Sequence, residues 1–181
     1  LDLPINCVKD HPKLDDSGCY VEILEAIYSQ LMAMLSYHNQ ILVVRADLHL
    51  TNNPDTNKTL SDILRKFKKS LLKKEYKKYH INKVAHIWAR ENTKDGTIHY
   101  HVIYMANANR IQCAMPLNDE LNLAARRIDY GINIHFGKYE KLRRNNIFDV
   151  IDNFSWLSYL AKERSKGLRK LTTNDYSNTR F

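Results

Sequence analysis

The sequence is poor in residues that break, link or cross-link a chain. It has five glycines, four prolines and three cysteines among 181 residues, with no internal repeat and no linker rich in proline or glycine. One domain spanning 1–181 is therefore expected. Cys7, Cys19 and Cys113 are widely spaced and form no C-x-x-C pair. This pattern predicts reduced thiols, as in a cytoplasm, and argues against a disulfide framework or a cysteine-based zinc site.

Long apolar runs are also missing. No apolar stretch approaches the roughly 18 residues that a membrane-spanning helix needs, so no membrane partner is expected. The first four residues have neither the basic nor the apolar region of a signal peptide. Hydrophobic residues still make up 44% of the chain, which argues against disorder. Within the domain we expect an irregular N-terminal arm over about 1–19 and a mobile tail over about 168–181.

Positive charge is concentrated in one segment. The formal net charge is +8, and residues 65–78 carry eight basic side chains and one acidic side chain, which gives 8 − 1 = +7. A solvated helix face and a phosphate-binding face both fit this pattern. A phosphate-binding face predicts DNA contacts by Lys66, Lys69, Lys73, Lys74, Lys77 and Lys78. Arg45, outside this segment, is also predicted to contact DNA.

The spacing of apolar residues predicts an α+β domain. Helices are expected over 20–38, 59–80, 118–130 and 146–165, and strands over 40–50, 82–92, 97–106 and 132–143. Strict alternation over 40–50 predicts one buried face and one face that carries Arg45, Asp47 and His49. Two strands joined by a short loop pair antiparallel, so we expect a largely antiparallel central sheet with helices packed against it.

A single H-x-H motif, His99-Tyr100-His101, falls on one of these strands. Residues two apart on a strand share a face, so both imidazoles can reach one ion. If residues 94–96 form a three-residue loop with Gly96 in the left-handed conformation, Glu91 lies opposite His99. A two-residue Asp95-Gly96 turn is the alternative, and it places Glu91 on the other face.

With the first register, Glu91, His99 and His101 form a one-carboxylate, two-imidazole set. Such a set suits Mg²⁺ or Mn²⁺ when phosphate and water complete the coordination sphere. It also suits non-haem iron, but that chemistry is usual in β-rich folds with fewer helices than this chain is expected to have.

Tyr159 is the one tyrosine among eleven with a lysine three residues later, Lys162. On a helix the two side chains lie on one side, and Tyr159 lies off the apolar stripe. A half-buried surface aromatic is the plain interpretation. The functional one is a phenol nucleophile, for which a nearby ammonium favours the phenolate and offsets charge on a phosphate.

These motifs resemble the HUH endonuclease superfamily, most closely its single-tyrosine rolling-circle replication initiators. Residues 88–91 followed by the H-x-H strand are similar to a prophage and filamentous-phage (inovirus-like) replication protein family. The resemblance spans roughly 40–170 and implies a ferredoxin-like variant of the sheet. It implies Glu91, His99 and His101 as metal ligands, Tyr159 as nucleophile and Lys162 as its helper.

The resemblance implies a nickase that cuts single-stranded DNA or a hairpin at a replication origin and forms a 5′-phosphotyrosine. It implies replication of a phage, prophage or plasmid element in the cytoplasm of a bacterial host cell, with a separately encoded or host helicase as partner. Asp47 or His49 is a candidate for a further ligand, although Asp47 can equally pair with Arg45. A non-catalytic DNA-binding regulator and a single-tyrosine transposase are the alternative functions.

Overall fold

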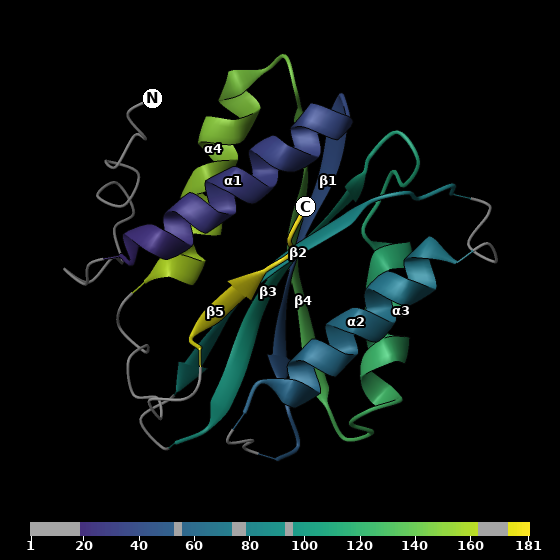
Figure 1. Cartoon of the computed structure of the whole chain (residues 1–181), viewed down its shortest axis with the longest axis vertical. Coiled ribbons are helices and arrows are strands. Elements are labelled where there is room, and N and C mark those ends of the chain that lie inside the picture. Colours follow the sequence, from purple (N-terminus) through teal and green to yellow (C-terminus); the bar gives the residue numbers. More distant parts are fainter. Residues whose placement is uncertain (1–18, 53–55, 74–78, 93–95, 163–173) are drawn as a thin grey trace.

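A computed structural model describes residues 19–52, 56–73, 79–92, 96–162 and 174–181 of the protein (Figure 1). The elements in chain order are α1 (Val21–Tyr37), β1 (Gln40–His49), α2 (Lys58–Leu72), β2 (Val84–Asn92), β3 (Ile98–Asn107), α3 (Met115–Arg126), β4 (Asn133–Arg143), α4 (Ile147–Leu157), the 3₁₀ helix η3 (Ser158–Ala161) and β5 (Tyr176–Asn178). No helix in the described part of the chain is long and apolar enough to cross a membrane.

The five strands form one sheet in the order β4-β1-β3-β2-β5. Each neighbouring pair is antiparallel. β2 and β3 are the predicted hairpin, and β1 inserts between β3 and β4. The α+β class with an antiparallel central sheet is therefore confirmed.

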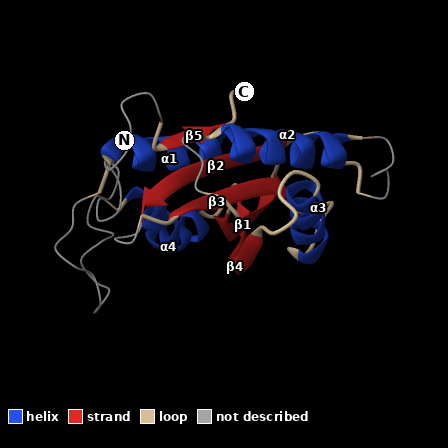
Figure 2. Ribbon diagram, turned by 90° about the horizontal axis from the view of Figure 1, so that it is seen from below, coloured by secondary structure: helices blue, strands red, loops and turns tan. Residues whose placement is uncertain are grey.

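Helices cover both faces of the sheet: α1 and α4 lie on one side, and α2 and α3 on the other (Figures 1 and 2). The alternation in β1 matches this division. Leu42, Val44, Ala46 and Leu48 pack into the core under α2 and α3, whereas Ile41 and Val43 pack under α1 and α4. The polar end of the second face carries Arg45, Asp47 and His49, as the sequence predicts.

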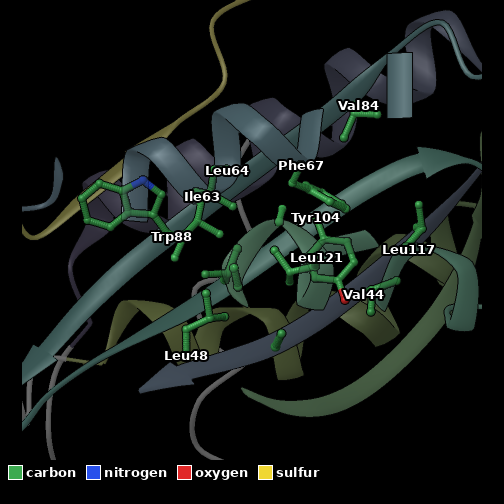
Figure 3. Close-up of a cluster of buried hydrophobic side chains, with 14 of the residues drawn as sticks. Val44, Leu48, Ile63, Leu64, Phe67, Val84, Trp88, Tyr104, Leu117 and Leu121 are labelled. Atoms are coloured by element: carbon green, nitrogen blue, oxygen red, sulfur yellow. The ribbon is translucent and has the colours of Figure 1, made fainter. Parts of the chain in front are cut away.

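The core under α2 and α3 is the larger of the two (Figure 3). Phe67 and Tyr104 are fully buried in it, with ring centroids 5.4 Å apart in an edge-to-face arrangement. Such a pair adds about 0.5–1.5 kcal/mol beyond the burial of its area. This packing fixes α2 to the sheet face opposite that of Arg45 and Asp47.

Two predicted helices are too long. α2 ends at Leu72 and Lys73 has extended backbone, so the predicted end at 80 is wrong. The buried stripe of α2 ends at Leu71. Leu72 is exposed, and no aliphatic residue stands between it and Ile81 to bury a further turn. α4 ends at Leu157 and changes to η3, so a regular helix to 165 is also wrong. Residues 74–78 and 163–173 lie outside the described parts.

The end of the chain forms β5, so the prediction of a mobile tail is wrong for residues 176–178. The backbone N–H of Arg90 donates to the carbonyl of Asp175 at 2.7 Å, and that of Thr179 donates to the carbonyl of His86 at 2.9 Å. The Gln30 amide donates to the carbonyl of Thr179 at 2.9 Å. Three strand residues are too few for a periodic signal in the sequence. The predicted N-terminal arm lies almost wholly in 1–18, which the structure does not describe.

Candidate functional site

The register of the β2–β3 hairpin brings the three predicted ligands together. Glu91 pairs with His99, and Ala89 pairs with His101. Gly96 has φ +82°, the left-handed conformation that the three-residue loop requires. The predicted three-residue register is therefore confirmed, and the alternative two-residue turn is wrong. The side chain of Ala89, opposite His101, is small, so it leaves room for the imidazole on this face of the sheet.

Glu91, His99 and His101 form a compact, largely buried group. The Glu91 Oε2 atom lies 3.3 Å from His99 Nε2 and 3.1 Å from His101 Nε2. One ligand atom from each residue lies within 4.8 Å of the other two. Glu91 and His101 are only 8% and 5% exposed. Few polar groups are buried this deeply unless another group holds them.

The geometry around His101 fits a metal ligand. Its buried Nε2 has no hydrogen-bond partner among the described residues, although it faces Glu91. Its Nδ1 lies 2.5 Å from Asp47 Oδ1. A carboxylate that holds one ring nitrogen of a histidine orients the other nitrogen toward a metal. Glu91, His99 and His101 can together hold a divalent cation.

Asp47 acts on the site through His101 and Arg45. The Arg45 Nε lies 3.1 Å from Asp47 Oδ1, and Arg45 Nη2 lies 3.2 Å from both Asp47 Oδ2 and His101 Nδ1. Burial would raise the pKa of the Asp47 carboxyl, but hydrogen bonds from His101 and Arg45 hold it at about 2. Burial lowers the pKa of His101, and the Asp47 and Glu91 carboxylates reverse this, so the net shift is upward. Asp47 thus pairs with Arg45 and also contacts the candidate metal ligand His101.

His49 lies beside the cluster but does not join it. Its ring stacks on that of His99, with centroids 5.2 Å apart and planes 15° apart. Burial, and then the neighbouring His99, lower the pKa of His49. Within the described parts of the chain, the group that could hold a metal consists of Glu91, His99 and His101 alone.

Tyr159 lies next to the histidines. Its ring centroid is 5.7 Å from that of His101, with the planes 82° apart. Lys162 Nζ lies 4.5 Å and Arg45 Cζ 4.7 Å from the centre of the phenol ring. The phenol is 41% exposed, so a ligand can reach it. Lys162 directly follows η3, and its backbone N–H donates to the carbonyl of Tyr159 at 3.4 Å, which keeps the two residues close together.

The position of η3 is set by the segment before α1. The backbone N–H of Tyr20 donates to the carbonyl of Ala161 at 2.8 Å, and Cys19 forms an isolated antiparallel bridge with Lys162. Leu160 and Ala161 are fully buried against the core under α1 and α4. Tyr159, which points away from this core, is therefore held at the sheet surface.

The basic helix is not part of this site. Lys66, Lys69 and Lys73 belong to α2 or its end, on the sheet face opposite that of Tyr159. Lys74, Lys77 and Lys78 lie outside the described residues. Among the described residues that were predicted to contact DNA, Arg45 is the one that lies close to the group formed by Glu91, His99 and His101.

The sequence did not indicate the rim that β4 contributes. β4 pairs with β1 so that His135 lies opposite Asp47, and a bulge sets Gly137 and Lys138 opposite Arg45. Lys138 Nζ lies 5.7 Å from the centre of the Trp156 ring on α4. The register of two strands far apart in the chain has no local signal. The rim thus carries Lys138, which pairs with Glu140 at 3.0 Å, with the aromatic ring of Trp156 next to it.

Comparison with known proteins identifies a family for most of the chain. A family model described as the YagK/YfjJ C-terminal domain matches residues 8–131. The match includes the hairpin with Glu91, His99 and His101, and it stops before Tyr159 and Lys162. A search of curated proteins found no match. Since the family model covers more than half of its residues, the chain belongs to the YagK/YfjJ C-terminal domain family.

Proposed function

We propose that the protein is a metal-dependent endonuclease of the HUH type that cuts single-stranded DNA and attaches itself to the cut end through Tyr159. The observation that carries this proposal is the position of the Tyr159 ring, 5.7 Å from the ring of His101 on the same sheet face. A phenol, two imidazoles and a carboxylate in one accessible place suit attack on a phosphodiester.

In the proposed reaction, the Tyr159 oxygen attacks phosphorus and loses its proton to solvent. The bond between phosphorus and the 3′-oxygen breaks, and this oxygen leaves as a 3′-hydroxyl after it takes up a proton. The products are a 5′-phosphotyrosine and a free 3′ end, which can later be rejoined by strand transfer. A divalent cation held by Glu91, His99 and His101 would be Mg²⁺ or Mn²⁺ and would polarise the phosphodiester.

The cations around the phenol have distinct parts in this scheme. Lys162 offsets negative charge that develops on the phosphate. Arg45 contacts the ring of Tyr159 and also pairs with Asp47, so it links the phenol to the support of His101. The half-buried Trp156 suits a base of a single strand, and the exposed Lys138, which also pairs with Glu140 at 3.0 Å, lies next to it. Initiation of rolling-circle replication of a mobile element is the role we propose for this chemistry.

The test uses the full chain, Mn²⁺ and single-stranded oligonucleotides of randomised sequence with a fluorescent label at either end. A 5′-phosphotyrosine retains the downstream fragment, so a denaturing gel is expected to show a labelled protein band with the 3′ label and none with the 5′ label. A chelator is expected to abolish the band. Tyr159→Phe removes only the hydroxyl and is expected to abolish the band while DNA binding remains.

Tyr139→Phe is the matched control. Tyr139 is similarly exposed, at 45%, but it lies opposite Val44, on the α2 and α3 side of the sheet. The band is expected to persist in this variant. If Tyr159→Phe still forms the adduct, the nucleophile is another tyrosine. If the wild type forms no adduct, the result favours a non-catalytic DNA-binding protein.

A further inference from the structure

A hollow between α2 and α3 gathers four cations on the face opposite the candidate metal site. It has a volume of about 230 Å³ and is lined by Lys66, Lys69, Lys73 and Arg127, with Ser70 and Glu120 between them. All four cationic side chains are exposed. Four positive charges thus surround one carboxylate.

These cations differ from the others on the same helix. Lys58 and Arg65 both pair with Asp62, at 2.8 Å each. No acidic partner is present for Lys66, Lys69 or Lys73 within the described residues. The one carboxylate in the hollow, Glu120, accepts a hydrogen bond from the Ser70 hydroxyl and ties α3 to α2. The hollow therefore keeps an excess of positive charge for an external anion.

The lysines of the hollow suit a regular row of phosphates. Lys66 and Lys73 are seven residues apart, which is about 10 Å along a helix axis. The phosphates of one duplex strand form a regular row of negative charges, so more than one phosphate can lie against these cations at once. Because α2 is packed rigidly on the sheet through Phe67 and Leu71, its cations keep this spacing.

The lining also distinguishes duplex from single-stranded DNA. Binding of single strands commonly relies on bases that stack on aromatic side chains. The hollow has no aromatic residue in its lining, whereas the opposite face presents Tyr159 and Trp156. A strand seated at Tyr159 is separated from the hollow by the whole sheet.

From these observations we propose that the α2–α3 hollow, formed by Lys66, Lys69, Lys73 and Arg127, binds the phosphate backbone of double-stranded DNA. The choice of DNA as the polyanion rests on the proposed function. The protein would then hold a duplex on one face while the other face handles a single strand. Contacts to phosphates alone carry no sequence information, so this duplex binding is not sequence-specific.

Fluorescence anisotropy with a labelled duplex of arbitrary sequence, measured over a series of salt concentrations, tests the proposal. The variant Lys66→Gln/Lys69→Gln removes two charges from the hollow. Loss of two phosphate contacts is expected to reduce the slope of log affinity against log salt by about 2. The control Lys58→Gln/Arg65→Gln removes the same charge from the same helix and is expected to leave the slope nearly unchanged. Thermal melting verifies that both variants fold.

Each outcome is decisive. Equal loss of slope in both variants would overturn the proposal, because the effect would be one of net charge. An equal loss for a single-stranded oligonucleotide of the same length would mean that the hollow binds single strands. Tyr159→Phe is expected to retain wild-type duplex binding, and the hollow variant is expected to retain adduct formation on single strands. Suppose that the wild type forms no adduct, and that the slope of log affinity against log salt falls in Lys66→Gln/Lys69→Gln but not in the control. The proposed function then fails, and the proposed duplex site stands.

Discussion

The hydrogen bond between Asp47 and His101 offers a quantitative test of the proposed metal binding. Asp47→Asn keeps the size of the side chain but removes the negative charge that faces His101 Nδ1 at 2.5 Å. The amide can also donate to Nδ1, which would leave the proton on Nε2, the nitrogen that faces Glu91. If His101 binds a metal as proposed, both effects weaken it as a ligand.

The magnitude follows from the surroundings of Asp47. Loss of such a supporting carboxylate typically costs 10–100-fold in metal affinity, or about 1.4–2.7 kcal/mol. Arg45 already neutralises part of the Asp47 charge at 3.1 Å, and the Asp47 side chain is 19% exposed. We therefore expect a loss near the lower end, about tenfold.

Calorimetric titration with Mn²⁺ measures the affinity directly. Glu91→Gln removes a ligand and is expected to weaken binding more than Asp47→Asn does. Wild-type affinity in Asp47→Asn would refute the supporting role of this carboxylate. A loss as large as that of Glu91→Gln would instead make Asp47 a ligand itself.

Three further predictions concern the nucleophile, the hairpin and pH. Lys162→Ala is expected to slow adduct formation at Tyr159 without abolishing it, as followed in a time course, because Arg45 still lies beside the phenol. Gly96→Ala, at φ +82°, is expected to cost about 1–2 kcal/mol and to lower Tm by a few degrees, whereas Gly96→Asn costs less. Burial, with a smaller contribution from a nearby lysine, lowers the pKa of His86 to about 4. The unfolded chain therefore binds an extra proton between pH 6.5 and 4, and the free energy of unfolding falls by up to about 3 kcal/mol as pH decreases through this window. Denaturant titration of His86→Asn at several pH values is expected to show a weaker fall in the free energy of unfolding.

The predictable part of the site is the part that is local in sequence. Glu91, His99 and His101 lie within one hairpin, so the period of two and the left-handed Gly96 suffice to bring them together. The alternation in β1 likewise placed Asp47 on the correct face. The sequence left open whether Asp47 binds a metal or pairs with Arg45, because that depends on the β1–β3 register, which sets Asp47 opposite His101.

Other features depend on contacts between distant segments. The change from α4 to η3 accompanies the hydrogen bond between Tyr20 and Ala161, which joins opposite ends of the chain. β5 exists because β2 offers it an edge, and three residues carry no pattern of their own. The +7 segment was evident in the sequence, but the sheet face that it covers was not. That face depends on which side of the sheet buries Phe67.

The locality of the hairpin also has a consequence for folding. A contact between residues close in the chain closes with little loss of loop entropy, so β2 and β3 can pair before the rest of the sheet is complete. Tyr159 reaches the same place only after α4 has docked and Tyr20 has joined Ala161. A chain in which α4 has not docked would therefore retain the three ligand residues in register and have no tyrosine beside them. We therefore expect the three candidate ligands to come together before Tyr159 is aligned, and to stay together longer when the protein unfolds.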